Sequence, residues 1–223
     1  MIKNPYPGKF IAIEGVDGCG KSVQSQLVYD FLIQSGEKVL LTKEPAKYLP
    51  SGKLIYSLLF GKHEVKFANM TPRLRQRHYF INRIEHYDRT VIMALKSGVN
   101  VVTDRCFASV VFDVQRSGDL DILLSDEECY FEMAEVSFIR PDKIIILNLP
   151  SATAIKRLSE KDERRRDFFE QPEKIERTKE AYLEFANRFR EFCVVVDGSP
   201  NQERVFADVR DVVRHEVEVE VWR

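Results

Sequence analysis

Five short runs of apolar, mostly β-branched residues constrain the fold of this chain more than any other feature. Apolar residues follow one another in these runs instead of alternating with polar ones, which is typical of strands buried on both faces of a parallel sheet. Because longer amphipathic segments separate them, the chain is predicted to form an α/β sandwich of three layers. The runs span residues 9–15, 38–42, 100–104, 142–149 and 192–198.

The segments between the runs carry helical patterns. Residues 21–36 predict a helix that ends at Gly36, and residues 71–97 predict another that ends before Gly98. Ser151 is predicted to N-cap a helix over 152–160, and 172–192 and 201–215 are further helix candidates. The tail at 215–223, HEVEVEVWR, fits either an edge strand or a solvated helix end. In the long helix, a 3.6-residue spacing defines an apolar stripe of Phe80, Ile84, Tyr87, Val91 and Leu95.

Bulk properties narrow the class of protein. The 223 residues contain no repeat, linker or break in composition, so we expect one domain, 1–223. A net charge of −1 gives no general attraction to nucleic acid or anionic membranes. No run is long enough for a membrane span, and the N-terminus lacks the apolar core of a signal peptide. Four scattered cysteines are expected to be free thiols in a reducing, cytoplasmic compartment.

A glycine-rich loop follows the first run. Residues 15–22, GVDGCGKS, match the P-loop pattern G-x-x-x-x-G-K-[ST] between a buried strand and a helix. Backbone N–H groups of such a loop surround a phosphate chain, and the helix N-terminus adds positive potential. Lys21 is expected to reach the β- and γ-phosphates, and Ser22 to ligate Mg²⁺. The predicted nucleotide-binding residues are Gly15, Val16, Asp17, Gly18, Cys19, Gly20, Lys21, Ser22 and Val23.

A carboxylate ends the third run, and an arginine follows it. Asp104 is placed at the carboxyl end of a parallel strand, where open α/β sheets bind ligands. There it can hold Mg²⁺ or its waters opposite Ser22. The planar fork of Arg105 can bind a second phosphate.

Four blocks together resemble the thymidylate (dTMP) kinase family, over about residues 9–190. They are FIAIEGVDGCGKSVQ, KEP at 43–45, FINRIEH at 80–86 and DRCFAS at 104–109. The resemblance implies ATP·Mg²⁺-dependent phosphorylation of dTMP to dTDP, in dTTP synthesis. It also implies a five-stranded sheet of order 2-3-1-4-5 and a homodimer packed through helices, for which the apolar stripe of 71–97 is a candidate face.

Residue roles follow from the same resemblance. Asp17 would lie near the acceptor sugar and the transferred phosphate, and Arg105 would hold the acceptor monophosphate. Arg83 would hydrogen-bond the base, with Tyr79 stacked on it one helical turn earlier. Glu44, before Pro45, would lie beside the acceptor, and Ser109 would line the base pocket.

An arginine-rich segment at 156–171 resembles the lid of nucleotide kinases. Family members carry a catalytic arginine either in the P-loop or in the lid. The P-loop position here is Gly18, so the resemblance implies that the lid supplies it, through Arg164 or Arg166.

Three departures from the family pattern leave the base preference open. Cys106 stands where tyrosine or histidine is usual, Val110 replaces a small polar residue that contacts the base, and AKYLPSG replaces a glycine-rich run after Pro45. A base-edge hydrogen bond would then come from Arg83, Ser109, Gln115 or backbone. The alternatives are a monophosphate kinase with another base preference, a deoxynucleoside kinase with Glu44 as base, and a P-loop switch protein without a small acceptor.

Overall fold

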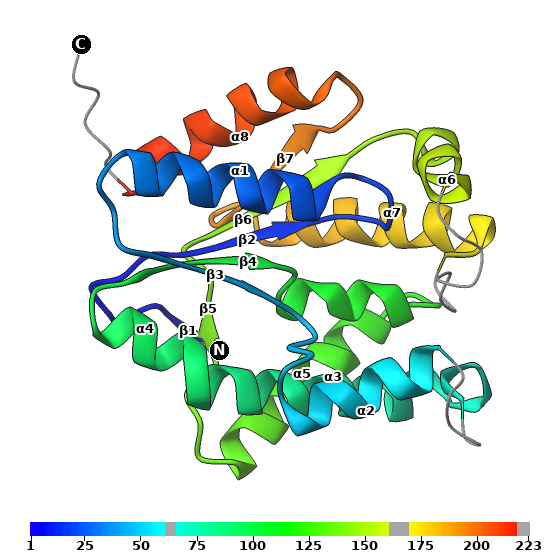
Figure 1. Cartoon of the computed structure of the whole chain (residues 1–223). Coiled ribbons are helices and arrows are strands. Elements are labelled where there is room, and N and C mark those ends of the chain that lie inside the picture. The colour runs from blue at the N-terminus through cyan, green and yellow to red at the C-terminus, as the bar shows by residue number, and fades with distance from the viewer. Residues whose placement is uncertain (61–65, 161–169, 218–223) are drawn as a thin grey trace.

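A five-stranded parallel sheet forms the centre of the molecule (Figure 1). The computed structural model describes residues 1–60, 66–160 and 170–217. The strands lie in the order β3-β4-β2-β6-β7, which is 2-3-1-4-5 when these five are counted along the chain, as expected. They are β2 (Phe10–Glu14), β3 (Val39–Lys43), β4 (Asn100–Asp104), β6 (Lys143–Asn148) and β7 (Cys193–Asp197).

Burial of the strands depends on their place in the sheet. Every residue of β2 and β4 is buried, as continuous apolar runs predict. The two edge strands, β3 and β7, are only partly buried, and Val195 of β7 is exposed. The expectation of burial on both faces is therefore wrong for both, because a strand with a single neighbour has less cover. A separate parallel pair, β1 (Ile2–Lys3) and β5 (Ile139–Arg140), was not predicted; two residues are too few for a periodic pattern.

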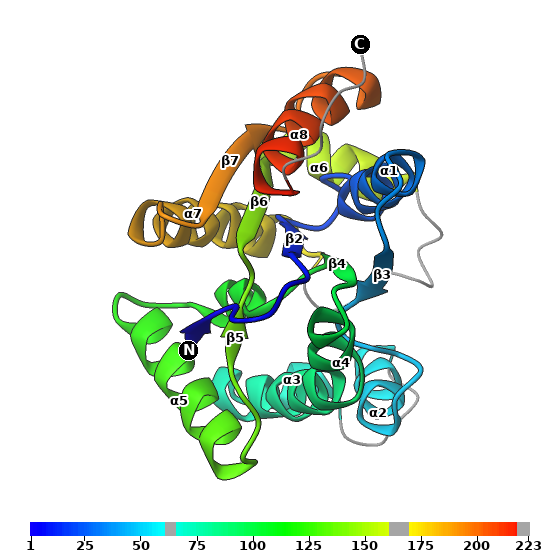
Figure 2. The same ribbon diagram turned by 90° about the vertical axis from the view of Figure 1, so that its left-hand side faces the viewer.

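Helices cover both faces of the sheet, which confirms the three-layer prediction (Figure 2). Helices α1 (Lys21–Gln34) and α8 (Gln202–Val217) lie together on one face. On the other lie α5 (Asp119–Met133), α7 (Pro172–Arg188) and a 3₁₀ segment at Phe107–Asp113. The start of the 215–223 tail continues α8 to Val217, and the rest lies outside the described residues.

Two helical predictions need correction, and further helical elements were not predicted. The expected helix over 71–97 is α3 (Pro72–His86), a π-helical turn (Tyr87–Val91) and α4 (Ile92–Lys96). Helix α6 (Ser151–Ser159) begins at Ser151 itself, with Pro150 at the N-cap, so Ser151 is not the cap. Helices α2 (Pro50–Leu59) and α5 were not predicted, nor was a short 3₁₀ turn at Phe67–Asn69.

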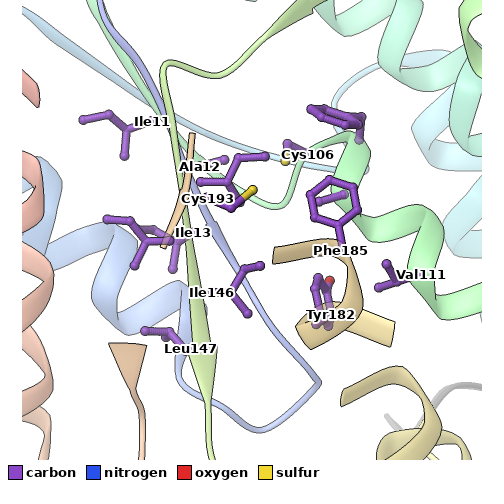
Figure 3. Packing of buried hydrophobic residues seen from close by; sticks show 14 of the residues in the cluster. Ile11, Ala12, Ile13, Cys106, Val111, Ile146, Leu147, Tyr182, Phe185 and Cys193 are labelled. Atoms are coloured by element: carbon purple, nitrogen blue, oxygen red, sulfur yellow. The ribbon is translucent and has the colours of Figure 1, made fainter. Parts of the chain in front are cut away.

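The core joins both layers to the sheet. Figure 3 shows Ile146 of β6 beside Tyr182 and Phe185 of α7, with Val111 of the 3₁₀ segment near them. Phe80, Tyr87, Val91 and Leu95 are fully buried in this core and Ile84 packs against it. The stripe of 71–97 therefore faces inward, and its expected role as a dimer face is wrong for this chain.

The register of the sheet brings the predicted site residues together. Asp104 at the end of β4 pairs with both Ile13 of β2 and Lys43 of β3. The residues that follow these three strands therefore meet at one edge of the sheet, where ligands bind in this class of fold.

Candidate active site

A cleft of about 400 Å³ opens at the carboxyl ends of β2, β3 and β4. Asp17, Gly18, Gly20, Lys21 and Ser22 line one end of it. The other end is lined by side chains of α3 and of the 3₁₀ segment, including Gln76, Tyr79, Asn82, Arg83 and Phe112. One continuous space therefore connects the glycine-rich loop to a polar and aromatic pocket.

The glycine-rich loop is shaped by close packing against α6. Gly18 has φ +84°, and a Cβ on it would lie 2.6 Å from the carbonyl oxygen of Ala154. An arginine at this position would meet both a strained backbone and the adjacent helix. The structure thus gives a physical reason for glycine at the position where some family members carry arginine.

The side chain of Lys21 folds back over the glycine-rich loop. Its Nζ donates to the carbonyl oxygen of Val16 at 2.8 Å and lies 3.7 Å from Asp17 Oδ1. The neighbouring Cys19 is buried, and this burial raises the pKa of its thiol. A thiol held in its neutral form fits a packing role for Cys19.

Ser22 and Asp104 face each other as predicted. Ser22 Oγ donates to Asp104 Oδ2 at 2.5 Å, and Lys43 Nζ donates to the same oxygen at 2.9 Å. Burial opposes ionisation of Asp104, but the charges of Lys21 and Lys43 outweigh it and hold the pKa of this carboxyl below its ordinary value. The other oxygen, Oδ1, is buried and has no hydrogen-bond partner among the described residues.

This pair fits Mg²⁺, a hard cation that binds oxygen. The described part of the chain contains no cluster of three or more His, Cys, Asp or Glu side chains suited to a metal ion. A hydroxyl and one carboxylate suffice for Mg²⁺, because nucleotide phosphates and waters commonly supply the remaining ligands.

Arg105 lies between the glycine-rich loop and the other end of the cleft. It has φ 80°, a left-handed conformation that is uncommon outside glycine. Its guanidinium pairs with Asp17 and lies over the ring of Phe112, 4.5 Å from the centroid. Burial disfavours its charge, but Asp17 and Tyr182 more than compensate, and the pKa of Arg105 is raised. Arg105 therefore stays cationic where the two halves of the cleft meet.

The buried carboxylate of Glu14 holds the residues that follow Arg105. It is fully buried at the end of β2 and accepts from the backbone N–H of Cys106 at 2.7 Å. Ser109 Oγ and the Tyr182 hydroxyl donate to it at 2.9 and 2.6 Å. Ser109 does line the cleft, but its hydroxyl is committed to Glu14.

Arg83 lies in a buried group of charges at the end of the cleft that α3 lines. It pairs with Glu44 and Glu127, and its Nη2 donates to the carbonyl oxygen of Cys106 at 3.1 Å. Burial raises the pKa of Glu44, but Arg83 and His86 outweigh it, so the net shift is downward. For Glu127 burial dominates over the charge of Arg83 and raises the pKa to about 7.

Tyr79 lies one turn before Arg83, as predicted, and lines the same end of the cleft. Its ring packs against the ring of Phe67 in a tilted arrangement, with centroids 5.6 Å apart and planes at 48°. An aromatic face in a cleft offers a surface on which a planar base can stack.

A family model described as "Thymidylate kinase" matches residues 13–209 of the chain. The chain is 33% identical to the thymidylate kinase of Nitrosomonas europaea, over 95% of this chain and 93% of the relative. It is 31% identical to a probable thymidylate kinase of Thermococcus onnurineus, over 93% and 98% of the two chains. The chain belongs to the thymidylate kinase family. Phosphorylation of dTMP to dTDP is accordingly its activity.

Two of the three departures from the thymidylate kinase pattern, Cys106 and Val110, have structural explanations. The Cys106 side chain is buried. Its backbone N–H donates to Glu14 and its carbonyl oxygen accepts from Arg83, so the backbone of Cys106, and not its side chain, positions these two groups. Val110 is fully buried in the core instead of lining the cleft. Gln115 is exposed and is not among the residues that line the cleft.

Several residues of this thymidylate kinase site were missed from the sequence. Lys43, Gln76, Asn82, Phe112 and Arg157 line the cleft without having been assigned a role there. Gln76 could have been found, because it shares a helical face with Tyr79 and Arg83 at i, i+3 and i+7. Arg157 lies on α6 in the segment predicted as the lid, whereas Arg164 and Arg166 lie outside the described residues.

Within the part of the chain that the structure describes, no helix is long and apolar enough to span a membrane. All four cysteines are free thiols, as expected.

Proposed function

We propose that this thymidylate kinase transfers the γ-phosphoryl group of ATP·Mg²⁺ in line to the phosphate of dTMP. The observation that carries the proposal is the cleft itself, which joins the P-loop to the pocket around Arg83, with Arg105 at the junction. Donor and acceptor phosphates bound at its two ends would meet near Asp17 and Arg105. Such positioning is the main requirement of phosphoryl transfer.

On the donor side, the nucleotide would lie along residues 15–23. Backbone N–H groups of the loop would bind its phosphates, and Lys21 would turn from Val16 to the transferred group. Ser22 and Asp104 would hold Mg²⁺, and the unpartnered Oδ1 of Asp104 supports this. When bound, the ion neutralises charge on the phosphate oxygens.

On the acceptor side, Arg105 would bind the dTMP phosphate and Asp17 would lie beside it. Tyr79 would stack on the base and Arg83 would donate to it. Glu44 would act through Arg83, with which it pairs, and Ser109 would contribute to the wall of the pocket.

The reaction needs no general base. The second pKa of a phosphate monoester is ≈ 6, so the attacking oxygen is already an anion at neutral pH. A deoxynucleoside kinase would instead need Glu44 to accept a hydroxyl proton. The pKa of Glu44 is lowered and its oxygens face Arg83 and His86, which makes it a weak base.

The lid arginine is proposed from the sequence. Arg164 or Arg166 would approach the transferred phosphoryl group, and the neighbouring Arg157 already lines the cleft from α6. We further propose a single catalytic domain over 1–223 with a lid at about 156–171, a cytoplasmic location, and a homodimer. Since the inner stripe of α3 is buried, exposed Leu74 and Ile81 on its outer side are the candidate contacts.

An ATP-coupled assay with dTMP and thymidine side by side tests the proposal. We expect turnover of dTMP that is lost on removal of Mg²⁺, and no turnover of thymidine. Turnover of thymidine without dTMP would identify a deoxynucleoside kinase instead.

A further inference from the structure

We propose that Gln76 determines base specificity by accepting a hydrogen bond from the N3–H group of thymine. The inference rests on the proposed function and adds a residue that reads the base edge. It is carried by the position of Gln76 in the cleft and by the hydrogen bond that fixes its side-chain amide.

Gln76 lies on the face of α3 that lines the cleft. It precedes Tyr79 by three residues and Arg83 by seven, so the three side chains project from one side of the helix. All three line the cleft. Gln76 has a relative exposure of 2%, so its amide lies in a protected environment where a hydrogen bond discriminates strongly.

The orientation of the Gln76 amide is set by Asp113. Gln76 Nε2 donates to Asp113 Oδ2 at 2.7 Å. Asp113 is buried, and Arg75 Nε donates to its Oδ1 at 2.8 Å. Arg75 is fixed in turn by the carbonyl oxygen of Phe67 at 2.8 Å. Burial raises the pKa of the Asp113 carboxyl, but its pairing with the cationic Arg75 favours the carboxylate form. Because a carboxylate only accepts hydrogen bonds, Gln76 meets Asp113 with its N–H group and not with its oxygen.

The amide oxygen is therefore the atom of Gln76 left for a ligand. Among the described residues, no hydrogen bond to Gln76 Oε1 is formed, although the residue is almost completely buried. The oxygen is not among the buried side-chain oxygens that lack a partner, so it is accessible from the cleft that Gln76 lines, where a ligand with a donor can reach it.

Arg83 supplies the complementary group. Among the described residues, three of its five N–H groups donate to Glu44, Glu127 and Cys106, and the other two form no hydrogen bond there and are proposed to donate to a ligand. Gln76 and Arg83 line the same cleft, so the pocket presents both an acceptor and a donor to a base. Thymine matches with its N3–H and O4, whereas cytosine presents an acceptor at N3 and an amino group at C4 and is mismatched at both positions.

Gln76 also fills the role that the polar residue at position 110 has in other family members. The sequence left Ser109 and Gln115 as alternative readers, but Ser109 Oγ donates to Glu14 and Gln115 is exposed away from the cleft. Gln76 brings a side-chain amide to the same end of the cleft from a different element.

The test compares Gln76→Met with Gln115→Met. Both changes remove an amide at similar side-chain length, but the second affects an exposed residue outside the cleft. We expect Gln76→Met to lower kcat/KM for dTMP by about 10-fold, through KM, because one hydrogen bond is removed. The ratio of dCMP to dTMP dissociation constants, from calorimetry, should fall by a similar factor. The KM for ATP should change little, and Gln115→Met should match the wild type in all readouts. The Tm of Gln76→Met should fall, because the buried Asp113 Oδ2 loses the donor that Gln76 supplies.

Equal weakening of dTMP and dCMP, or unchanged dTMP kinetics, would overturn the assignment. A second arm uses the wild-type protein with N3-methyl-dTMP, and it decides the question even if the variant does not fold or dCMP binding is too weak to measure. We expect binding of this analogue to be at least about 10-fold weaker than that of dTMP; equal binding overturns the assignment. Failure of the proposed function would appear separately, as a wild-type protein that does not phosphorylate dTMP.

Discussion

At the residue scale, the site depends on buried charges that are satisfied by partners far away in the sequence. The sequence predicted that Arg83 faces the base. It did not predict that Arg83 pairs with Glu127, which lies 44 residues away in the chain. Two carboxylates share this one guanidinium, and Glu127 Oε2 has no partner among the described residues. Burial, in this arrangement, leaves Glu127 as the group that titrates near neutral pH.

Replacing Glu127 with Gln should change how stability depends on pH. The carboxyl pKa is raised from 4.5 to about 7 in the folded state. Its contribution to stability is therefore fully present below pH 4.5 and is lost as pH rises through 7. A glutamine does not titrate. The free energy of unfolding of the wild type relative to Glu127→Gln should fall by about 2–3 kcal/mol between pH 4.5 and 8, because one pKa unit corresponds to about 1.4 kcal/mol.

Urea unfolding at several pH values measures this difference. The matched control is Glu132→Gln, which changes an exposed carboxylate on the same helix and should track the wild type. A wild-type-to-Glu127→Gln difference that stays constant with pH would contradict the account.

At the element scale, the strands and the P-loop could be predicted because each is a local pattern. The two missed helices break their own patterns. In α5 the inward face is Leu120, Leu123, Glu127 and Phe131, so a charge interrupts the apolar stripe. In α2 a Cβ on Gly52 would lie 2.0 Å from the Ala46 carbonyl oxygen, so close packing requires glycine there. In a sequence pattern, the same glycine indicates the end of a helix. Contacts such as Glu14 with Tyr182, 168 residues apart, follow from the topology and have no local signal.

The packing of the P-loop on α6 predicts a specific cost for Gly18→Ala. Gly36 is the control, because it has nearly the same φ, +85° against +84°, but nothing within 4 Å of an added Cβ. Gly36→Ala should destabilise the protein by about 1 kcal/mol through backbone strain. Gly18→Ala should cost about 1–3 kcal/mol more, because α6 must move, and should raise the KM for ATP by about 10-fold.

Thermal unfolding and ATP kinetics of the two variants test this. Equal destabilisation by both, with the KM for ATP unchanged in Gly18→Ala, would show that the contact between the loop and α6 is unimportant.

At the scale of the whole molecule, the cleft is assembled from parts that lie far apart in the chain. The P-loop, α3, the 3₁₀ segment and α6 all contribute to it, and each has residues in the same hydrophobic core. The order of the central sheet was expected from the family resemblance and is confirmed. The shape of the pocket could not be predicted, because it depends on side-chain packing that no sequence pattern specifies. Because one extensive core connects these elements, binding at either end of the cleft should stabilise all of them.

Thermal unfolding should therefore show one cooperative transition. At about 100 times its dissociation constant, dTMP should stabilise the protein by ~2.7 kcal/mol and shift that whole transition upward. ATP·Mg²⁺ should shift the same transition. Two transitions that respond separately to the two ligands would contradict a single domain.

The most direct test of the central claim follows the label of [γ-³²P]ATP in the presence of Mg²⁺ and dTMP. We predict that the label appears in the β-phosphate of dTDP, at a rate that saturates with dTMP. Label released as inorganic phosphate at a rate independent of dTMP would identify a nucleotide hydrolase and contradict the account.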